Sequence, residues 1–274
     1  MALAQDGLLY PIRFTATTYN IRVEVNSVLE TIPFPATGSL TAGRNYYVSG
    51  DGQADSSTNN GTGDLLLLLK TALDAHSEAV AQSATFTVSA TAANLVTISI
   101  SATDFRISWG DVLTTLDYEI FGFIAADAPS PADTDTTAPD NAKGIWRPAV
   151  VRGFDSRDRQ PFTGSVAQTM SGKTRTSALV TNAHKERELV WRLVTREKAL
   201  DEYVGADDPN GAFETAWRTA IALGYRFRFY EDISSRTSSS YTLYRARDLS
   251  DPLGRNETYP YRWDVSLACV RGDY

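Results

Sequence analysis

The chain has 274 residues, enough for one large domain or two medium ones, and 42% of them are hydrophobic, which is ample for sizeable cores. Its 26 lysine and arginine residues against 33 aspartate and glutamate residues give a net charge of −7. No basic run is visible, so general nucleic-acid binding is not expected. Cys269 is the only cysteine, which excludes intramolecular disulfides and cysteine-based zinc sites.

The chain shows no pattern typical of export or of membrane insertion. Asp6 interrupts the first residues before any basic and then apolar run, so no signal peptide is predicted. The longest apolar run, residues 65–69, is far too short to span a membrane. We therefore expect a soluble protein made in a cytoplasm.

Alternation of apolar and polar residues predicts most elements of the first half as strands. A polar loop is expected at 51–63, followed by a helix over 64–76 that Asp64 caps and that Leu65, Leu69 and Leu73 make amphipathic. Residues 112–123 predict a short helical turn that leads into a strand broken by glycine. The predicted strands are 13–25, 28–35, 44–50, 84–90, 95–101 and 104–109.

The composition changes sharply at residues 125–143. This segment holds Pro129, Pro131 and Pro139, several aspartates and threonines, and almost no large apolar side chain. Such a composition predicts a linker or a long exposed loop.

The second half is organised around residues 187–231. Strict alternation over 187–195 predicts a strand with Leu189, Trp191 and Leu193 on one face and Val190, Arg192 and Val194 on the other. A short amphipathic helix is predicted over 208–223, ended by Gly224, and 225–231 predicts a second strand. Further strands are expected at 145–151, 164–170, 174–181, 241–247 and 261–270, with a charged turn region at 152–159, a polar loop at 234–240 and a turn-rich segment at 248–260.

These elements predict a mainly β protein with short helices (α+β). We expect two β-sandwich or β-barrel-like domains, each flanked by one short amphipathic helix. The domains would span residues 1–124 and 144–274, joined by the segment 125–143. The similar order of elements in the two halves is compatible with a duplication and equally with chance, since no residue-level repeat is visible.

No motif makes a convincing catalytic, cofactor or metal site. Gly172-Lys173-Thr174 resembles the end of a phosphate-binding loop, but Ala167 stands where the first glycine is required, so a hairpin turn is the better interpretation. His76 and His184, the only histidines, lie in different halves without metal-binding spacing. His76 is expected to end the first helix, where its partial charge suits the helix dipole.

The remaining candidates also have simpler explanations. The aspartate-rich segments 51–63 and 127–140 lack the spacing of a calcium loop, although a weak structural cation is conceivable in either. The 5 Trp, 13 Tyr and 11 Phe residues fall mainly at strand and helix positions that fill a core, which leaves stacking on a sugar or a single-stranded nucleic acid as the lesser interpretation. Asn256-Glu257-Thr258 is a glycosylation sequon that matters only in a secretory compartment.

Several short strings resemble virion structural proteins of tailed bacteriophages. They are NYYVSGDG at 45–52 with the leucine-rich helix after it, FTVS at 86–89, FRISW at 105–109 and FGF at 121–123. The second half, with a strand, one short helix and a closing hairpin, is similar in outline to tail-tube and baseplate-ring subunits. In that family a β-sandwich flanked by a helix assembles into six-fold rings, with long loops or hairpins that bridge neighbours. A simple tube subunit usually has one such domain, whereas two are predicted here.

The resemblance implies a non-catalytic virion subunit, located in the tail, that forms a ring or tube as a tail-tube, distal-tail or baseplate component. Its partners would be itself, in a hexameric ring, and neighbouring tail proteins, without specific nucleic-acid binding and without a cofactor. Two alternatives stay open. One is a receptor- or carbohydrate-binding module that uses surface aromatics, and the other is a hydrolase whose carboxylates only the fold brings together.

Overall fold

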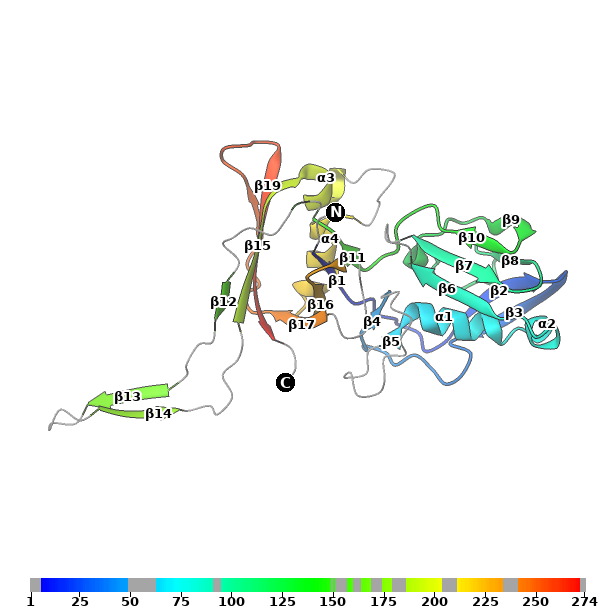
Figure 1. Cartoon of the computed structure of the whole chain (residues 1–274), viewed down its shortest axis with the longest axis horizontal. Helices are drawn as coiled ribbons and strands as arrows, with labels where there is room; N and C mark the ends of the chain where they lie inside the picture. The colour runs from blue at the N-terminus through cyan, green and yellow to red at the C-terminus, as the bar shows by residue number, and fades with distance from the viewer. Residues whose placement is uncertain are drawn as a thin grey trace.

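The computed structural model describes residues 6–48, 63–90, 95–148, 150, 157–159, 164–168, 174–178, 186–203, 211–233 and 241–271. The protein is mainly β, with 41% strand and 18% helix, and it contains several antiparallel sheets and a few short helices (Figure 1). This confirms the predicted fold class. The polar loop expected at 51–63 and the loop expected at 234–240 lie outside the described residues, except for Gly63.

The first half builds small sheets around one core. A four-stranded sheet has the order β3-β2-β8-β9, a three-stranded sheet has the order β10-β7-β6, and β4 and β5 form a short parallel pair. The strands are β2 (Tyr19–Val25), β3 (Val28–Phe34), β4 (Tyr46–Tyr47), β5 (Gly63–Asp64), β6 (Phe86–Ala90), β7 (Val96–Ile100), β8 (Phe105–Ser108), β9 (Asp127–Asp133) and β10 (Asp135–Thr137).

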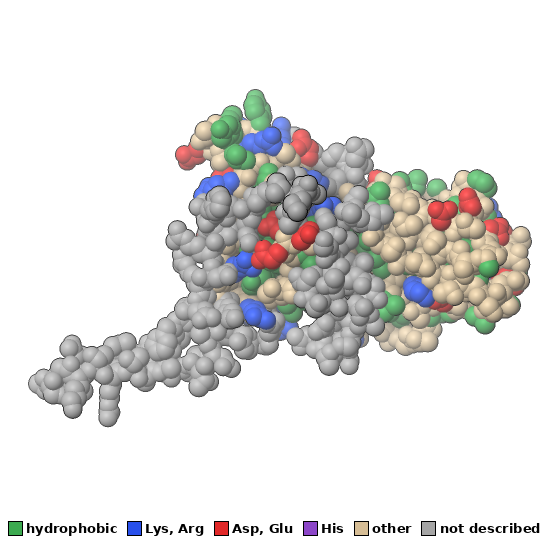
Figure 2. Space-filling view, in the orientation of Figure 1, with side chains coloured by type: hydrophobic (Ala, Val, Ile, Leu, Met, Phe, Trp, Pro, Cys, Tyr) green, Lys and Arg blue, Asp and Glu red, His purple; other side chains and the backbone are tan. Residues whose placement is uncertain are grey.

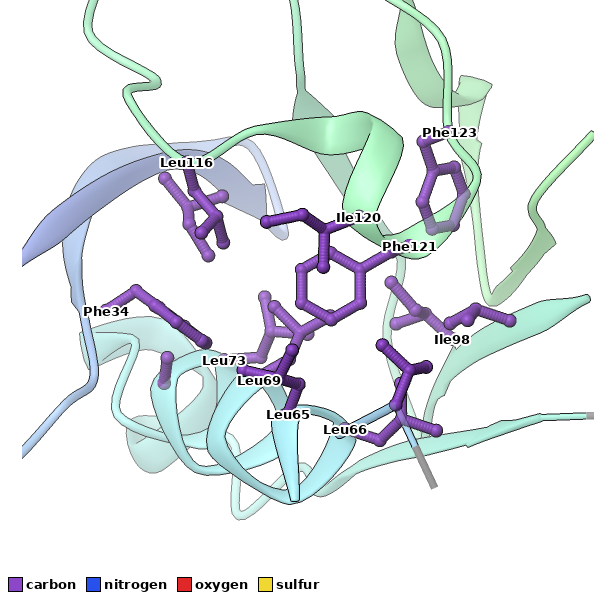
Figure 3. Close-up of a cluster of buried hydrophobic side chains, with 14 of the residues drawn as sticks. Phe34, Leu65, Leu66, Leu69, Leu73, Ile98, Leu116, Ile120, Phe121 and Phe123 are labelled. Carbon is purple, nitrogen blue, oxygen red and sulfur yellow. The ribbon is translucent and has the colours of Figure 1, made fainter. Parts of the chain in front are cut away.

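The predicted first helix is present as α1 (Leu65–Asp74). Asp64 caps it, because the carboxylate accepts a hydrogen bond of 2.9 Å from the amide of Leu66. Leu65, Leu69 and Leu73 are buried, and Figure 3 shows them facing the side chains of Phe34 and Phe121 in the core between the sheets. The short helix α2 (Ser77–Ala81) and the 3₁₀ turn η1 (Tyr118–Phe121) complete this half.

The prediction of a glycine-broken strand in 112–123 is wrong. The turn η1 ends at Gly122, whose φ of +80° allows a left-handed cap. A Cβ at Gly122 would lie 2.0 Å from the carbonyl oxygen of Asp140, so only glycine permits this close approach.

The prediction of a linker or loop at 125–143 is also wrong for this segment. It forms β9, which pairs with β8, and β10, which pairs with β7. Both are edge strands of their sheets, where the missing amide of a proline is tolerated. Ala138 and Ala142 that follow are buried in the first core.

The second half contains one eight-stranded antiparallel sheet, curled into a half-barrel, with the order β11-β1-β16-β17-β19-β15-β12 and β18 added beside β19. Its N-terminal strand β1 comes from the start of the chain, which the sequence assigned to the first domain. The strands are β1 (Gly7–Leu9), β11 (Ile145–Trp146), β12 (Arg157–Arg159), β15 (Glu186–Thr195), β16 (Phe227–Tyr230), β17 (Tyr241–Ala246), β18 (Leu253–Arg255) and β19 (Arg262–Arg271).

Short helical segments cover one face of this sheet. The helix predicted over 208–223 is present only in part, as α4 (Phe213–Ala216) continued by the π-helical turn η3 (Trp217–Ile221). Residues 204–210, which include its predicted first residues, lie outside the described residues. Phe213, Ala216 and Ile221 pack on the second core. The remaining segments are α3 (Arg196–Ala199) and η2 (Asp201–Tyr203).

One side-chain assignment in β15 is wrong. A β-bulge between Trp191 and Val194 shifts the register, so Val194 is buried beside Leu189 and Trp191, while Leu193 turns outward and is 38% exposed. Leu193 has a φ of +61°, the local distortion that accompanies the extra residue.

A separate ribbon is formed by β13 (Gly164–Gln168) and β14 (Thr174–Ala178). The two strands pair antiparallel over five residues, and they form a sheet of their own. Figure 1 shows this ribbon apart from both halves of the molecule. Along the chain it lies between β12 and β15, which are neighbours in the half-barrel.

The two cores meet at the strands β11, β1 and β16. Leu8 and the residues paired with it, Trp146 and Phe229, face the second core. On the opposite face of the same strands, Leu9 lies in a row with Ile145 and Arg228 and packs in the first core. This part of the sheet is therefore buried on both faces, and we call it the shared seam.

Arg228 is the unusual residue of the seam, because its side chain is fully buried. Its guanidinium carbon lies 4.3 Å from the ring centre of Tyr47 in the first half and 4.4 Å from that of Tyr241. The Tyr47 hydroxyl donates a hydrogen bond of 2.6 Å to the carbonyl oxygen of Arg226, and burial raises the pKa of this hydroxyl. Cation–π contacts of this kind hold a buried guanidinium between two apolar layers.

Candidate interaction surface

The residues that the sequence singled out do not come together in one site. Gly172, Lys173 and His184 lie outside the described residues. Thr174 begins the strand β14 and not a helix, so the helix N-terminus that a phosphate-binding loop requires does not follow it. Cys269 is buried in β19, where its thiol donates a hydrogen bond of 3.0 Å to the carbonyl oxygen of Arg187.

His76 has a different role from the one predicted. It lies after α1 as the N-cap of α2, with its Nδ1 atom accepting a hydrogen bond of 3.2 Å from the amide of Glu78. Because Nδ1 is an acceptor, Nε2 carries the proton and faces the carbonyl oxygen of Val23 at 3.3 Å. The imidazole is fully buried, so this arrangement explains the residue as a structural cap.

The aspartates of 127–140 fall mostly on the edge strands β9 and β10. Across the described parts of the chain, no three His, Cys, Asp or Glu side chains are placed to hold a metal ion. The large aromatic side chains are mainly in the cores, including Trp109, Trp146 and Trp191.

Two tyrosines differ from these buried aromatic residues, because their side chains are exposed. Tyr259 is 55% exposed and Tyr261 is 76% exposed, and both lie in the turn 256–261 that joins β18 to β19. Figure 2 shows hydrophobic side chains gathered at the top of the view, over this turn. We call residues 256–261 the tyrosine tip.

The tyrosine tip is held in one shape by its own hydrogen bonds. The side-chain oxygen of Asn256 accepts bonds from the amides of Thr258 and Tyr259, at 3.1 and 2.9 Å. The Nε atom of Arg255 donates to the carbonyl oxygen of Pro260 at 2.9 Å. A turn ordered in this way presents its aromatic side chains without a large entropic cost on binding.

Asp264 fastens the base of the tip to the bulge in β15. Its carboxylate accepts hydrogen bonds from the Asn256 amide group at 3.1 Å, from the backbone amide of Leu193 at 3.1 Å and from Arg192 at 3.0 Å. The bulge therefore directs the backbone amide of Leu193 toward the β18–β19 hairpin. β-Bulges are common next to functional surfaces.

A hollow lies beside the other end of the β18–β19 hairpin. It consists of two adjoining depressions of about 430 and 460 Å³ that share Glu188, Asp248 and Ala268, a size in the range of binding clefts. Two arginines, Arg187 and Arg247, also line it. We call the hollow the acidic trough after its five carboxylates: Glu186, Glu188, Asp248, Asp251 and Asp264.

The carboxylates of the trough do not resemble a general acid and base pair. Glu186 is ion-paired with Arg247, and Asp264 is ion-paired with Arg192. Hydrogen bonds from the amide and hydroxyl of Ser250 hold the pKa of Asp248 below its ordinary value, whereas a catalytic acid needs a raised pKa.

The sequence pattern did not predict this surface. Asn256 drew attention only as part of a sequon, and Tyr259 and Tyr261 were counted with the core aromatics. The available signal was the cluster of turn-forming residues around two tyrosines that do not continue the alternation of a strand.

None of the helices in the described residues has the length and apolar character needed to cross a membrane. Comparison of the chain with protein-family models and with curated proteins found no match.

Proposed function

We propose that this protein is a non-catalytic structural subunit that assembles with copies of itself into a ring or tube, as a tail component of a tailed bacteriophage. The observation that carries the proposal is the β13–β14 ribbon. Its strands pair with each other, and Figure 1 shows the ribbon away from the body of the molecule.

A lone two-stranded ribbon is only marginally stable in water, because it has no layer on which to pack. A neighbouring subunit supplies such a layer in an assembly. Protruding ribbons and free sheet edges are also the features through which one chain adds to the sheet of another. In the tail the expected partners are a hexameric ring of this chain and adjacent tail proteins.

The first test is negative-stain electron microscopy of the purified protein together with its native mass over a series of concentrations. Rings or tubes with a defined number of subunits are expected. A monomer at every concentration would contradict self-assembly.

A variant without the β13–β14 ribbon tests whether the ribbon is needed for assembly. Arg159 pairs directly with Glu186 across β12 and β15, so residues 160–185 can be replaced by a two-residue Asn-Gly turn that closes the same hairpin. We expect this variant to keep the circular dichroism spectrum of the parent and to lose its assembly. Unchanged assembly would show that the ribbon is not the bridging element.

A further inference from the structure

The tyrosine tip carries free positive charge as well as exposed aromatic rings. Arg255 and Arg262 flank the tip and are both exposed, and neither forms an ion pair within the described part of the chain. Glu257 is the only acidic residue between them. The tip is thus a rigid, weakly basic knob with two tyrosines.

The acidic trough has the complementary properties. Five carboxylates and two arginines line it, and Asp251 forms no ion pair with the side chains that the structure describes. Between the charges lie apolar surfaces of Pro252, Leu253 and Ala268, on which an aromatic ring packs well. Leu249, which is 58% exposed, lies in the same turn segment as Asp248 and Asp251.

The tip cannot fill the trough of its own subunit. One end of the trough reaches Gly254 and Asp264 at the base of the tip, but its acidic residues Glu188, Asp248 and Asp251 lie beyond Leu253, on the side of the hairpin away from the turn. The pairing of Leu253, Gly254 and Arg255 with β19 keeps the turn at the far end of these strands. Contact between them is therefore possible only between two copies. Because it joins different surfaces of identical subunits, such a contact is heterologous and repeats into a ring or an open filament.

We propose that the tyrosine tip of one subunit docks into the acidic trough of the next, with Tyr259 and Tyr261 as anchors and with Arg255 and Arg262 facing Glu188, Asp248 and Asp251. This inference rests on the proposed function and adds to it the subunit surfaces that make the contact. Aromatic anchors with charged neighbours are typical centres of binding energy in interfaces.

A charge-swap experiment tests the contact. The tip variant Arg262→Glu, which keeps the hydrogen bond of Arg255 to Pro260, and the trough variant Asp248→Lys/Asp251→Lys are each expected to raise the dissociation constant of subunit association at least tenfold, by analytical ultracentrifugation. An equimolar mixture of the two variants is expected to assemble again. In that mixture the acidic tip meets a lysine trough, and the unchanged basic tip meets an unchanged acidic trough.

Three further variants serve as comparisons. Tyr259→Ala/Tyr261→Ala is expected to weaken association at least tenfold without any change of charge. Arg44→Glu, a charge reversal in the first half, and Glu202→Lys, a reversal outside the trough, are expected to leave association unchanged. Circular dichroism spectra identical to that of the parent show that each variant is folded.

Association that is unaffected by either charge variant would overturn the docking inference and leave the proposed function standing. Weakened association that the mixture does not restore would also overturn it, since the charges would then act elsewhere. A glycan that binds the parent but not the tyrosine variant, with association unchanged, would assign the tip to carbohydrate instead. A parent protein that never associates would contradict both this contact and the proposed function.

Discussion

The two halves of this protein build their hydrophobic cores in different ways. The first half surrounds its core with several small sheets and packs the well-capped helix α1 against them. The second half relies on one large curled sheet and a helical segment that passes from an α to a π turn. The first core is closed mainly by local elements, whereas the second needs strands from the start, middle and end of the chain.

The shared seam joins the two halves. In β1 and β11, adjacent residues point into different cores, because side chains alternate between the faces of a strand. Three short strands thus serve both cores at once. We therefore expect that substitutions in the seam destabilise both halves, whereas substitutions elsewhere destabilise only the half that contains them.

The largest effect is expected at Arg228. Arg228→Ala would leave a cavity between Tyr47 and Tyr241 and is expected to lower the free energy of unfolding by about 2–5 kcal/mol. Urea denaturation measures this change, and hydrogen exchange should accelerate in both β2 and β15. Arg245→Ala, at an exposed position of β17, is the control and is expected to change stability by less than about 0.5 kcal/mol. Faster exchange in only one half would show that the seam does not couple the cores.

The β-bulge in the second half gives a sharper comparison between neighbours. Val194→Ala removes buried methyl groups and is expected to cost about 2–3 kcal/mol of stability. Leu193→Ala removes an outward-facing side chain and is expected to cost less than about 0.5 kcal/mol. Denaturant midpoints of the two variants compare them directly. The reverse order of effects would mean that β15 follows the uninterrupted alternation.

In the first half the expected effect at His76 is smaller. His76→Ala removes the cap of α2 and the contact with Val23, and a loss of about 1–2 kcal/mol is expected in thermal or urea unfolding. His76→Asn keeps a side-chain acceptor near the amide of Glu78 and should recover part of this loss. Equal stability of the alanine and asparagine variants would contradict the capping role.

The smallest effect concerns pH. Hydrogen bonds from the hydroxyl and the amide of Ser77 hold the pKa of the Glu30 carboxyl below its ordinary value of 4.5. The stabilisation is therefore present above that value and is lost as the pH falls through the lowered pKa. Glu30→Gln cannot ionise, so between pH 6 and pH 3 the parent should lose more stability than the variant, by less than about 1 kcal/mol since the side chain is partly exposed. Parallel stability curves would remove this role.

Local patterns predicted much of the second half correctly but failed where the strand was irregular. The strand predicted over 225–231 is present as β16, and the alternating residues Tyr225, Phe227 and Phe229 all pack with the second core. The same rule failed at Leu193, because the bulge adds one residue and reverses the faces after it. Nothing in the local alternation signals that extra residue.

The prediction of a loop at residues 125–143 was wrong for a different reason. Its composition is poor in apolar residues, yet two sheets offer it an edge where prolines are acceptable and where few buried side chains are needed. Composition describes what a segment can bury, and it does not reveal which free edges the rest of the fold presents.

The sequence by itself determined the mainly β class, the helix α1 with its Asp64 cap and most strands, since these follow from the periodicity of side chains and from local hydrogen bonds. Tertiary structure alone decided that β1 joins the distant half-barrel, that Arg228 is buried between two cores and that Asp264 aims the tyrosine tip. Each of these depends on partners far away in the chain, and a sequence pattern carries no record of which distant residues will become neighbours.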